Sequence, residues 1–191
     1  GFTLHHMANG EAEMRYTAKP EHLNTFDVTH GGASMTLMDV AMAVAARSLE
    51  SDDFGCVTIE MKTSFMQAAR GPLVPQLDGF IVPNGLAFSP DGRTMYLSDS
   101  HPGVQKIWAF DYDTDSGTPS RRRLFVDMLE YPGRPDGAAV DAEGCYWICG
   151  NDAGLIHRFT PDGRLDRSLA VPVKKPTMCA FGGPRLDTLY V

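Results

Sequence analysis

A group of side chains suited to acyl transfer occurs early in the sequence: Asn24, His30, Gly31, Gly32 and Asp39. The two glycines are expected to open a helix, where free backbone N–H groups carry partial positive charge. Such N–H groups can stabilise a developing oxyanion. Asp39 lies among apolar residues of the same expected helix, where a carboxylate is costly unless it has a partner or a role. The pattern predicts that Asp39 activates water or attacks an acyl group directly.

Each of these residues also has an ordinary structural interpretation. Asn24 suits a turn, His30 suits the start of a helix, and Asp39 suits an exposed helix position. The combination at this spacing nevertheless favours a catalytic role. Residues 1–74 resemble the hotdog-fold acyl-CoA thioesterases of the phenylacetate-degradation type, which carry an Asn, a His-Gly-Gly at the helix start and an Asp in the helix.

The thioesterase resemblance implies a role for each position. The Gly31 amide would form the oxyanion hole, Asn24 would position water or substrate, and Asp39 would be the base or nucleophile. His30 would support the loop, and Thr58 matches a polar residue on the next strand that helps to hold water. The family builds its sites across a dimer interface, so the resemblance implies a homo-oligomer that acts on an acyl-CoA without a cofactor.

A second set of oxygen-bearing side chains lies on two Pro/Gly turns. Asn84 follows Pro83, and Asp136 lies in the segment RPDG at 134–137. Both turns begin sequence repeats, so both residues are expected at the same end of neighbouring units. Convergent oxygen ligands suit a hard cation such as Ca²⁺, Mg²⁺ or Mn²⁺, although Asn and Asp in turns are usually only turn formers.

Residues 77–191 resemble the gluconolactonase/senescence-marker/luciferin-regenerating β-propeller family. The segments that carry this likeness are PNG, SPDG, DS, RPDG and VDAEG, which begin at residues 83, 89, 99, 134 and 140. The resemblance implies that Asn84 and Asp136 bind a divalent cation (Ca, Mg, Mn or Zn), and that Asp136 doubles as the base in lactone hydrolysis. It also implies that the family's remaining ligands, a Glu and a second Asn, lie on earlier blades.

The elements expected to carry the first set form an α+β segment. Residues 10–18 alternate polar and apolar and predict a strand, as do residues 57–66. Residues 33–48 lack Gly and Pro and are rich in Ala, Met and Leu, which predicts a helix. Because this helix is apolar on nearly all sides, we expect it to be buried. Strand, buried helix and strand predict a partial hotdog-like segment over 1–74.

The second set lies in a region that repeats itself. Residues 86–97 return as 138–148 and in part as 178–191, each a short strand, a Gly-containing turn and an aromatic-bearing strand. Residues 106–112 and 156–159 give further strand signals. Repeats of this length are typical of β-propeller blades. At about 45 residues per blade, 77–191 predict an all-β partial propeller of about two and a half blades, fewer than the four that closure requires.

Composition excludes several classes of function. The net charge of −7, from 17 basic and 24 acidic residues, argues against a nucleic-acid surface, and the one basic run, 121–123, is expected to be a solvated loop. No stretch approaches the ~20 apolar residues of a membrane span, and residues 1–10 lack the pattern of a signal peptide. Cys145 and Cys149 would lie ~13 Å apart on one strand, too far for a disulfide. The four cysteines are expected to be buried or half-buried thiols, and a reducing cytoplasm is the expected location.

The sequence therefore predicts a hydrolase with a small-molecule substrate. Thioester hydrolysis is favoured because its set of residues is complete within 1–74. Metal-dependent lactone hydrolysis by 77–191 is the alternative, and a non-catalytic chimeric or truncated scaffold is a third. Whether the junction near 72–79 is natural or artificial stays open.

Overall fold

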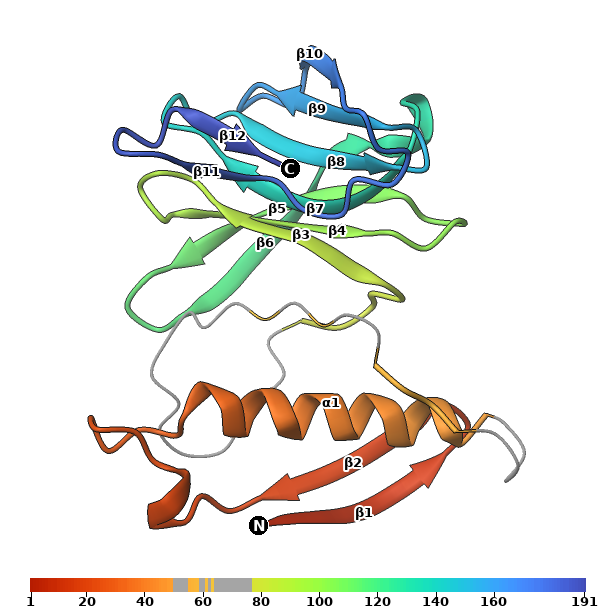
Figure 1. The fold of residues 1–191 in the computed structure, drawn as a ribbon, viewed down its shortest axis with the longest axis vertical. Helices are drawn as coiled ribbons and strands as arrows, with labels where there is room; N and C mark the ends of the chain where they lie inside the picture. The colour runs from red at the N-terminus through yellow and green to blue at the C-terminus, as the bar shows by residue number, and fades with distance from the viewer. Residues whose placement is uncertain (50–54, 59–60, 62, 64–76) are drawn as a thin grey trace. The chain divides into compact units, whose positions relative to one another are not determined.

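The computed structural model describes residues 1–49, 55–58, 61, 63 and 77–191, and the chain divides into two compact units, Gly1–Val74 and Pro75–Val191 (Figure 1). The described structure is mostly β, with one α-helix. The strand predicted over 57–66 lies largely outside the described residues, and its described members are not in a strand.

A hairpin opens the N-terminal unit. Strands β1 (Phe2–Ala8) and β2 (Glu11–Tyr16) pair antiparallel, and Asn9 and Gly10 join them with φ of 52° and 82°. Positive φ at both positions is what a two-residue hairpin turn requires, and Asn-Gly is its favoured sequence. β2 was predicted. β1 was not, although the Asn-Gly pair was the signal that could have found it.

The helix of this unit begins at the two glycines, as expected. After the short 3₁₀ turn η1 (Pro20–His22), α1 spans Gly31–Arg47, and the His30 side chain caps it by accepting from Gly32 N at 3.0 Å. The prediction that this helix is buried is wrong for the described residues, where only Ser34 and Leu37 of α1 are buried. The two-stranded sheet on which it packs can cover only one side of it (Figure 1).

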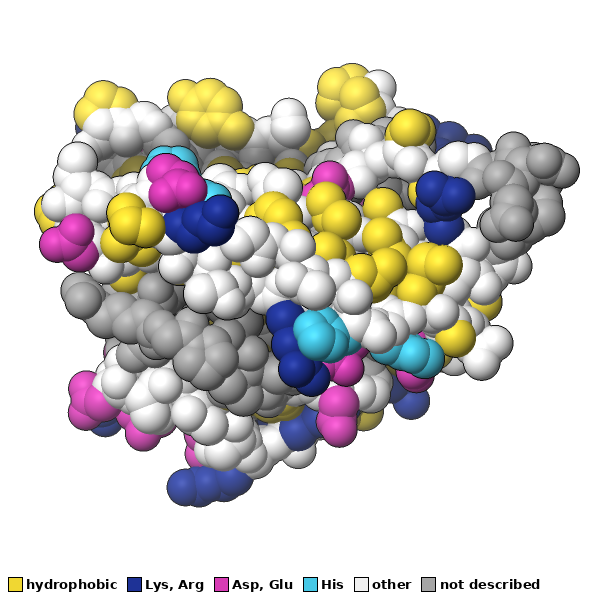
Figure 2. All heavy atoms as spheres, turned by 90° about the horizontal axis from the view of Figure 1, so that it is seen from below, with side chains coloured by type: hydrophobic (Ala, Val, Ile, Leu, Met, Phe, Trp, Pro, Cys, Tyr) yellow, Lys and Arg dark blue, Asp and Glu magenta, His cyan; other side chains and the backbone are white. Residues whose placement is uncertain are grey.

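Apolar side chains remain at the surface of this unit. Phe2, Leu4 and Met7 on β1 and Met42 on α1 are each 39–52% exposed. Figure 2 shows apolar side chains gathered on the face of the molecule seen in that view. Although the helix is apolar on nearly all sides, the described residues do not enclose it in a hydrophobic core.

The C-terminal unit contains two antiparallel sheets of four strands and one of two (Figure 1). The first has the order β3-β4-β5-β6, from β3 (Pro83–Phe88), β4 (Thr94–Asp99), β5 (Lys106–Asp113) and β6 (Thr118–Asp127). The second has the order β7-β8-β9-β10, from β7 (Arg134–Val140), β8 (Tyr146–Asn151), β9 (Leu155–Phe159) and β10 (Leu165–Ala170). The 3₁₀ turn η2 (Met128–Glu130) links them, and β11 (Ala180–Gly182) pairs with β12 (Thr188–Tyr190).

These sheets follow the sequence repeats, but their outer strands were not predicted. β10 is exposed along its whole length and β6 over most of it, so neither shows a clear apolar alternation. The run 121–123 lies in β6 and is not a loop, which corrects the expectation from charge. Arg121 and Arg123 both pair with Asp111 on the neighbouring strand, and Arg122 lies 4.0 Å from the ring centre of Trp108.

The core lies where the two four-stranded sheets meet. Tyr96 and Ile107 of the first sheet and Tyr146, Ile148 and Phe159 of the second belong to one buried cluster. The rings of Tyr96 and Tyr146 lie 5.0 Å apart. Burial of these side chains ties the sheets together, because apolar surface removed from water stabilises by about 25 cal/mol per Å².

The cysteines and the membrane expectation can be checked in the described part of the chain. Cys145, Cys149 and Cys179 are buried and Cys56 is exposed, and none of these four described residues forms a disulfide. Exposure of Cys56 differs from the expectation of buried or half-buried thiols. Among the described helices, none combines the length and hydropathy needed to cross a membrane.

Candidate functional site

The structure brings Asn84 and Asp136 into direct contact. Asn84 is the second residue of β3 and Asp136 the third of β7, and these strands of different sheets lie side by side. Asn84 Nδ2 donates to Asp136 Oδ1 at 2.8 Å, while Asn84 Oδ1 accepts from Gly85 N at 3.0 Å. Two residues separated by 52 positions thus meet at the starts of equivalent repeat strands, as the turns predicted.

A third side chain completes this group. Asn151, the last residue of β8, donates from Nδ2 to Asp136 Oδ2 at 2.9 Å. The Asp136 carboxylate is therefore held between two amides, one from each sheet. Asn151 is buried, with 8% of its surface exposed, and its Oδ1 atom is fully buried without a hydrogen-bond partner.

Two hydrogen bonds beside these residues join the sheets. The Tyr146 hydroxyl donates to the Gly85 carbonyl at 2.6 Å, next to Asn84. The Ser100 hydroxyl donates to the Pro135 carbonyl, next to Asp136. Burial raises the pKa of Tyr146 well above its ordinary value, so the hydroxyl remains a donor near neutral pH. Each backbone segment that carries a candidate ligand is thereby fixed to the opposite sheet.

The donor chemistry of the site fits a hard divalent cation. One carboxylate and two amides supply oxygen atoms, which Ca²⁺, Mg²⁺ and Mn²⁺ prefer over nitrogen or sulfur. Among the described residues, the buried side-chain polar atoms without a partner are Tyr16 Oη, Ser98 Oγ and Asn151 Oδ1. An unpartnered buried oxygen costs about 1–3 kcal/mol, and a cation would relieve that cost at Asn151.

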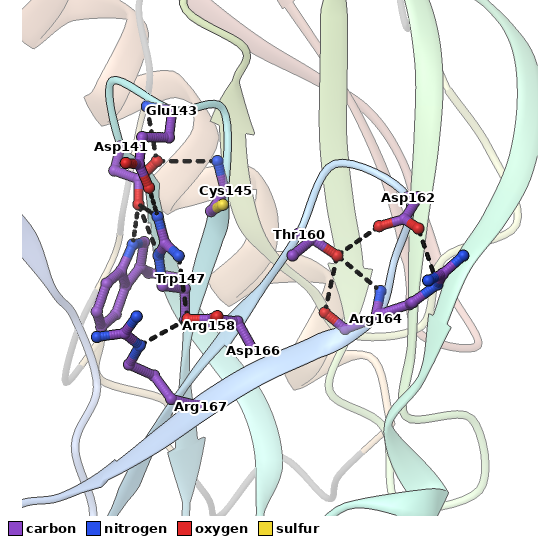
Figure 3. Close-up of polar contacts among 10 residues, drawn as sticks. All are labelled: Asp141, Glu143, Cys145, Trp147, Arg158, Thr160, Asp162, Arg164, Asp166 and Arg167. Carbon is purple, nitrogen blue, oxygen red and sulfur yellow. Dashed lines mark hydrogen bonds and ion pairs between the residues drawn. The ribbon is translucent and has the colours of Figure 1, made fainter.

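A second acidic group in this unit has a different chemistry (Figure 3). Asp141, Glu143 and Cys145 place ligand-type atoms within 4.8 Å of one another. Arg158 already lies among them, with Nη2 at 2.7 Å from Asp141 Oδ2 and a further contact to Glu143. The guanidinium supplies the positive charge that a metal would bring. This group is consequently an ion-pair network and not a metal site.

The network shifts the pKa of its members. Burial alone would raise the pKa of Asp141, but hydrogen bonds from Trp147 Nε1 and Arg158 outweigh that effect and lower it. Burial would lower the pKa of Arg158, but bonds to Asp141, Asp166 and Glu143 raise it. Both groups therefore stay charged at neutral pH, and each stabilises the other.

The residues of the thioesterase motif are placed only partly as predicted. Thr58 Oγ1 donates to Asp39 Oδ1, so these two residues meet. Asn24 Oδ1 accepts from Phe26 N at 2.8 Å and Val28 N at 3.3 Å, and forms a local turn. His30 acts as the helix cap.

Gly31 and Asp39 lie at different levels of one helix. Gly31 is the first residue of α1, and Asp39 lies eight residues further on. At 1.5 Å per residue, this spacing separates the two by about 12 Å along the helix axis. An oxyanion hole at Gly31 and a base at Asp39 of the same chain therefore do not face one substrate.

Comparison with known proteins identifies the family. Residues 52–191 match the SMP-30/Gluconolactonase/LRE-like region, a span that covers most of the chain. The chain belongs to this family. Residues 26–75 also match the Thioesterase superfamily, so both resemblances seen in the sequence are confirmed, and the two matches overlap over 52–75.

Several relatives are similar to this chain. A 6-deoxy-6-sulfogluconolactonase of Pseudomonas putida is 44% identical over 112 residues, which are 58% of this chain and 38% of the relative. Pentonolactonase XacC of Haloferax volcanii is 32% identical over 81% of this chain and 50% of its own. The solved structure of a calcium-binding protein, regucalcin from Agrobacterium tumefaciens, is 34% identical with a TM-score of 0.53, over 56% of this chain and 36% of that one. The chain thus spans half or less of the length of these relatives.

Asn151 and the two sheet-joining donors were not found from the sequence. The equivalence of Asn151 to a residue of the first sheet appears only in the strand pairing, where Pro83 pairs with Asp99 and Pro135 pairs with Gly150. Ser100 follows Asp99 and Asn151 follows Gly150, so the two occupy equivalent positions. The side chain of each donates a hydrogen bond to a residue of β7.

Proposed function

We propose that this chain belongs to a metal-dependent lactone hydrolase and carries part of its site in residues 75–191. The sequence favoured thioester hydrolysis and kept lactone hydrolysis as the alternative, and we now reverse that order. The observation that supports the reversal is the contact between Asn84 and Asp136 across two sheets, in a chain of the gluconolactonase-like family. The names of the lactonase relatives and of the calcium-binding regucalcin point to the same chemistry.

In this proposal the described residues bind the cation and move one proton. Asn84 and Asp136 would hold the divalent ion, which when bound would supply Lewis-acid polarisation of the lactone carbonyl. Asp136 accepts the proton of the attacking water. The water oxygen bonds to the lactone carbonyl carbon, the ring C–O bond breaks, and the leaving ring oxygen takes the proton from Asp136, so the product is a hydroxy acid. Tyr146 and Ser100 keep the two strands at a fixed separation throughout.

The experiment is lactone hydrolysis by the 191-residue chain in a pH-stat, with aldonolactones as substrates and with Ca²⁺, Mg²⁺, Mn²⁺ or a chelator added. We expect turnover that depends on the cation and that falls by about 10²-fold or more in Asp136→Asn, as loss of a general base does. Asp187→Asn is the matched control, because Asp187 is an exposed carboxylate that pairs with Arg185. Turnover that the chelator does not lower, or equal turnover by Asp136→Asn and the parent chain, would contradict the proposal.

A second candidate function is thioester hydrolysis by the N-terminal unit. It is supported by the match of 26–75 to the Thioesterase superfamily and by the hydrogen bond from Thr58 to Asp39. Asp39→Asn should then lower kcat on an acyl-CoA by about 10²-fold or more while lactone hydrolysis is unchanged. Equal thioester turnover by the variant and the parent would remove this candidate.

A further inference from the structure

We propose that Asn151 supplies a third oxygen ligand to the cation held by Asn84 and Asp136, an assignment that rests on the proposed function. Asn151 reaches the site from the end of β8 and already contacts the Asp136 carboxylate at 2.9 Å. Its own oxygen, Oδ1, is fully buried and receives no hydrogen bond. A native structure rarely keeps such an atom without a reason, and a bound cation supplies one.

The dimensions of the contact suit coordination of one ion. Oxygen ligands lie 2.3–2.6 Å from Ca²⁺, so two ligands of one ion lie at most about 5 Å apart. The amide of Asn151 and the carboxylate of Asp136 are well within that span. Because the hydrogen bond to Asp136 uses Nδ2, the oxygen Oδ1 remains available to the same ion. In this arrangement Asn151 donates to Asp136 before the ion arrives and ligates the ion afterwards.

The charges around Asn151 favour a cation at this position. The neighbouring strand partner, Arg134, directs its guanidinium to Asp152, with Nε and Nη2 at 3.0 Å and 2.8 Å from Asp152 Oδ2. Its positive charge is therefore shared with that carboxylate, while the amide of Asn151 faces the carboxylate of Asp136. A cation bound there would meet one negative charge and two amide dipoles.

Affinity alone cannot distinguish a ligand from a residue that only orients Asp136. Loss of an orienting partner already weakens metal binding by about 10- to 100-fold. The two roles differ in the atom that they need. A ligand needs the Asn151 oxygen, whereas an orienting residue needs the Asn151 N–H group. Asn151→Asp keeps an oxygen and removes the donor, and Asn151→Leu removes both.

The experiment measures Ca²⁺ affinity by calorimetry and counts the waters on bound Tb³⁺ from its luminescence lifetime in H₂O and D₂O, with the 191-residue chain. We expect Asn151→Leu to weaken binding and to add one water to the bound ion. Asn151→Asp should keep the water count of the parent and bind Ca²⁺ roughly tenfold more tightly, because ligand charge tunes affinity. If Asn151→Leu fails to fold, the Ca²⁺ affinity and water count of Asn151→Asp still test the ligand role of Asn151.

The results separate this inference from the proposed function. An unchanged water count in Asn151→Leu, or weaker binding by Asn151→Asp, overturns the ligand role of Asn151 and leaves the metal site of Asn84 and Asp136 standing. If the parent chain binds neither Ca²⁺ nor Tb³⁺, the proposed function fails and the ligand role fails with it.

Discussion

Tyr146 in one four-stranded sheet donates its hydroxyl to the backbone carbonyl of Gly85 in the other, at 2.6 Å. Tyr146 has no exposed surface, and Gly85 adjoins the candidate ligand Asn84. Gly85 has φ of 59°, and a Cβ on it would lie 2.5 Å from the Tyr146 hydroxyl. The close approach therefore depends on a glycine at this position. The hydrogen bond thus positions β3, the strand that carries Asn84, through a buried side chain of the neighbouring sheet.

Tyr146→Phe should destabilise the C-terminal unit. Removal of the hydroxyl leaves the Gly85 carbonyl buried without its donor, which typically costs about 1–3 kcal/mol. Chemical denaturation would measure the loss in free energy of unfolding. Tyr190→Phe is the matched control, because Tyr190 is 58% exposed and should tolerate the change. Equal stability of Tyr146→Phe and the parent would show that the bond does not hold the sheets together.

Two glycine substitutions separate backbone strain from steric conflict. Gly133 and Gly144 have φ of 93° and 80°, so alanine is strained at both, by roughly 1–2 kcal/mol. A Cβ on Gly133 would also lie 2.6 Å from the backbone carbon of Gly150, whereas on Gly144 its nearest neighbour is Pro161 at 3.5 Å. Gly133→Ala should consequently lower the melting temperature much more than Gly144→Ala. Similar decreases in melting temperature in the two variants would mean that the backbone at Gly150 can move away from the added methyl group at little cost.

The parts of the fold that repeat in sequence were predictable. Glycine-containing turns and the repeated segments beside them mark β3, β4, β7 and β8, because local turn chemistry specifies where such strands begin and end. The outer strands β6 and β10 were not predictable in this way. β10 is exposed throughout, so no buried face imposes period two on its sequence.

The two turn residues of the candidate site could be predicted from the sequence, but its third residue could not. Asn84 and Asp136 stand out because Pro and Gly flank them in equivalent repeats. Asn151 follows an apolar strand, and its role depends on a hydrogen bond across the sheet that no local pattern encodes. The burial of α1 failed as a prediction for a related reason. A helix that is apolar on nearly all sides could be buried on all of them, but its own sequence does not say which elements pack against it.

Arg158 should be more important for stability than the surface arginines. It is 8% exposed and pairs with Asp141, whose side chain is 14% exposed. Arg158→Met would leave Asp141 without its cation, and breaking a buried pair in this way costs about 3–5 kcal/mol. Arg158→Lys should not restore the parent stability, because one ammonium cannot replace a planar group that reaches Asp141, Asp166 and Glu143 together.

The control for Arg158 is Arg164→Met. Arg164 pairs with Asp162 on the surface, with 85% of its side chain exposed, and such pairs contribute little. Equilibrium unfolding of the three variants and the parent would compare the two positions. Equal losses at Arg158 and Arg164 would mean that the network shown in Figure 3 does not stabilise the fold.

Acid should weaken the C-terminal unit through Asp99. This carboxylate is 1% exposed and accepts from the backbone N–H groups of Ile81, Val82 and His101 at 2.7–3.0 Å. Burial alone would raise the pKa of Asp99, but these three bonds outweigh it and lower the pKa below 3.8. A depressed folded-state pKa contributes stability that is fully present above the unfolded value, and that is lost as pH falls through the folded value.

Asp99→Asn tests this sign directly. The neutral amide offers one acceptor oxygen where the carboxylate has two, so the variant should be less stable than the parent at pH 7. The difference should shrink as the pH falls below 3.8, because protonation removes the advantage of the carboxylate in the parent. Urea unfolding of both proteins between pH 2 and 7 would measure it, with the exposed Asp187→Asn as the control. A difference that stays constant across this range would show that the charge of Asp99 contributes nothing to folding.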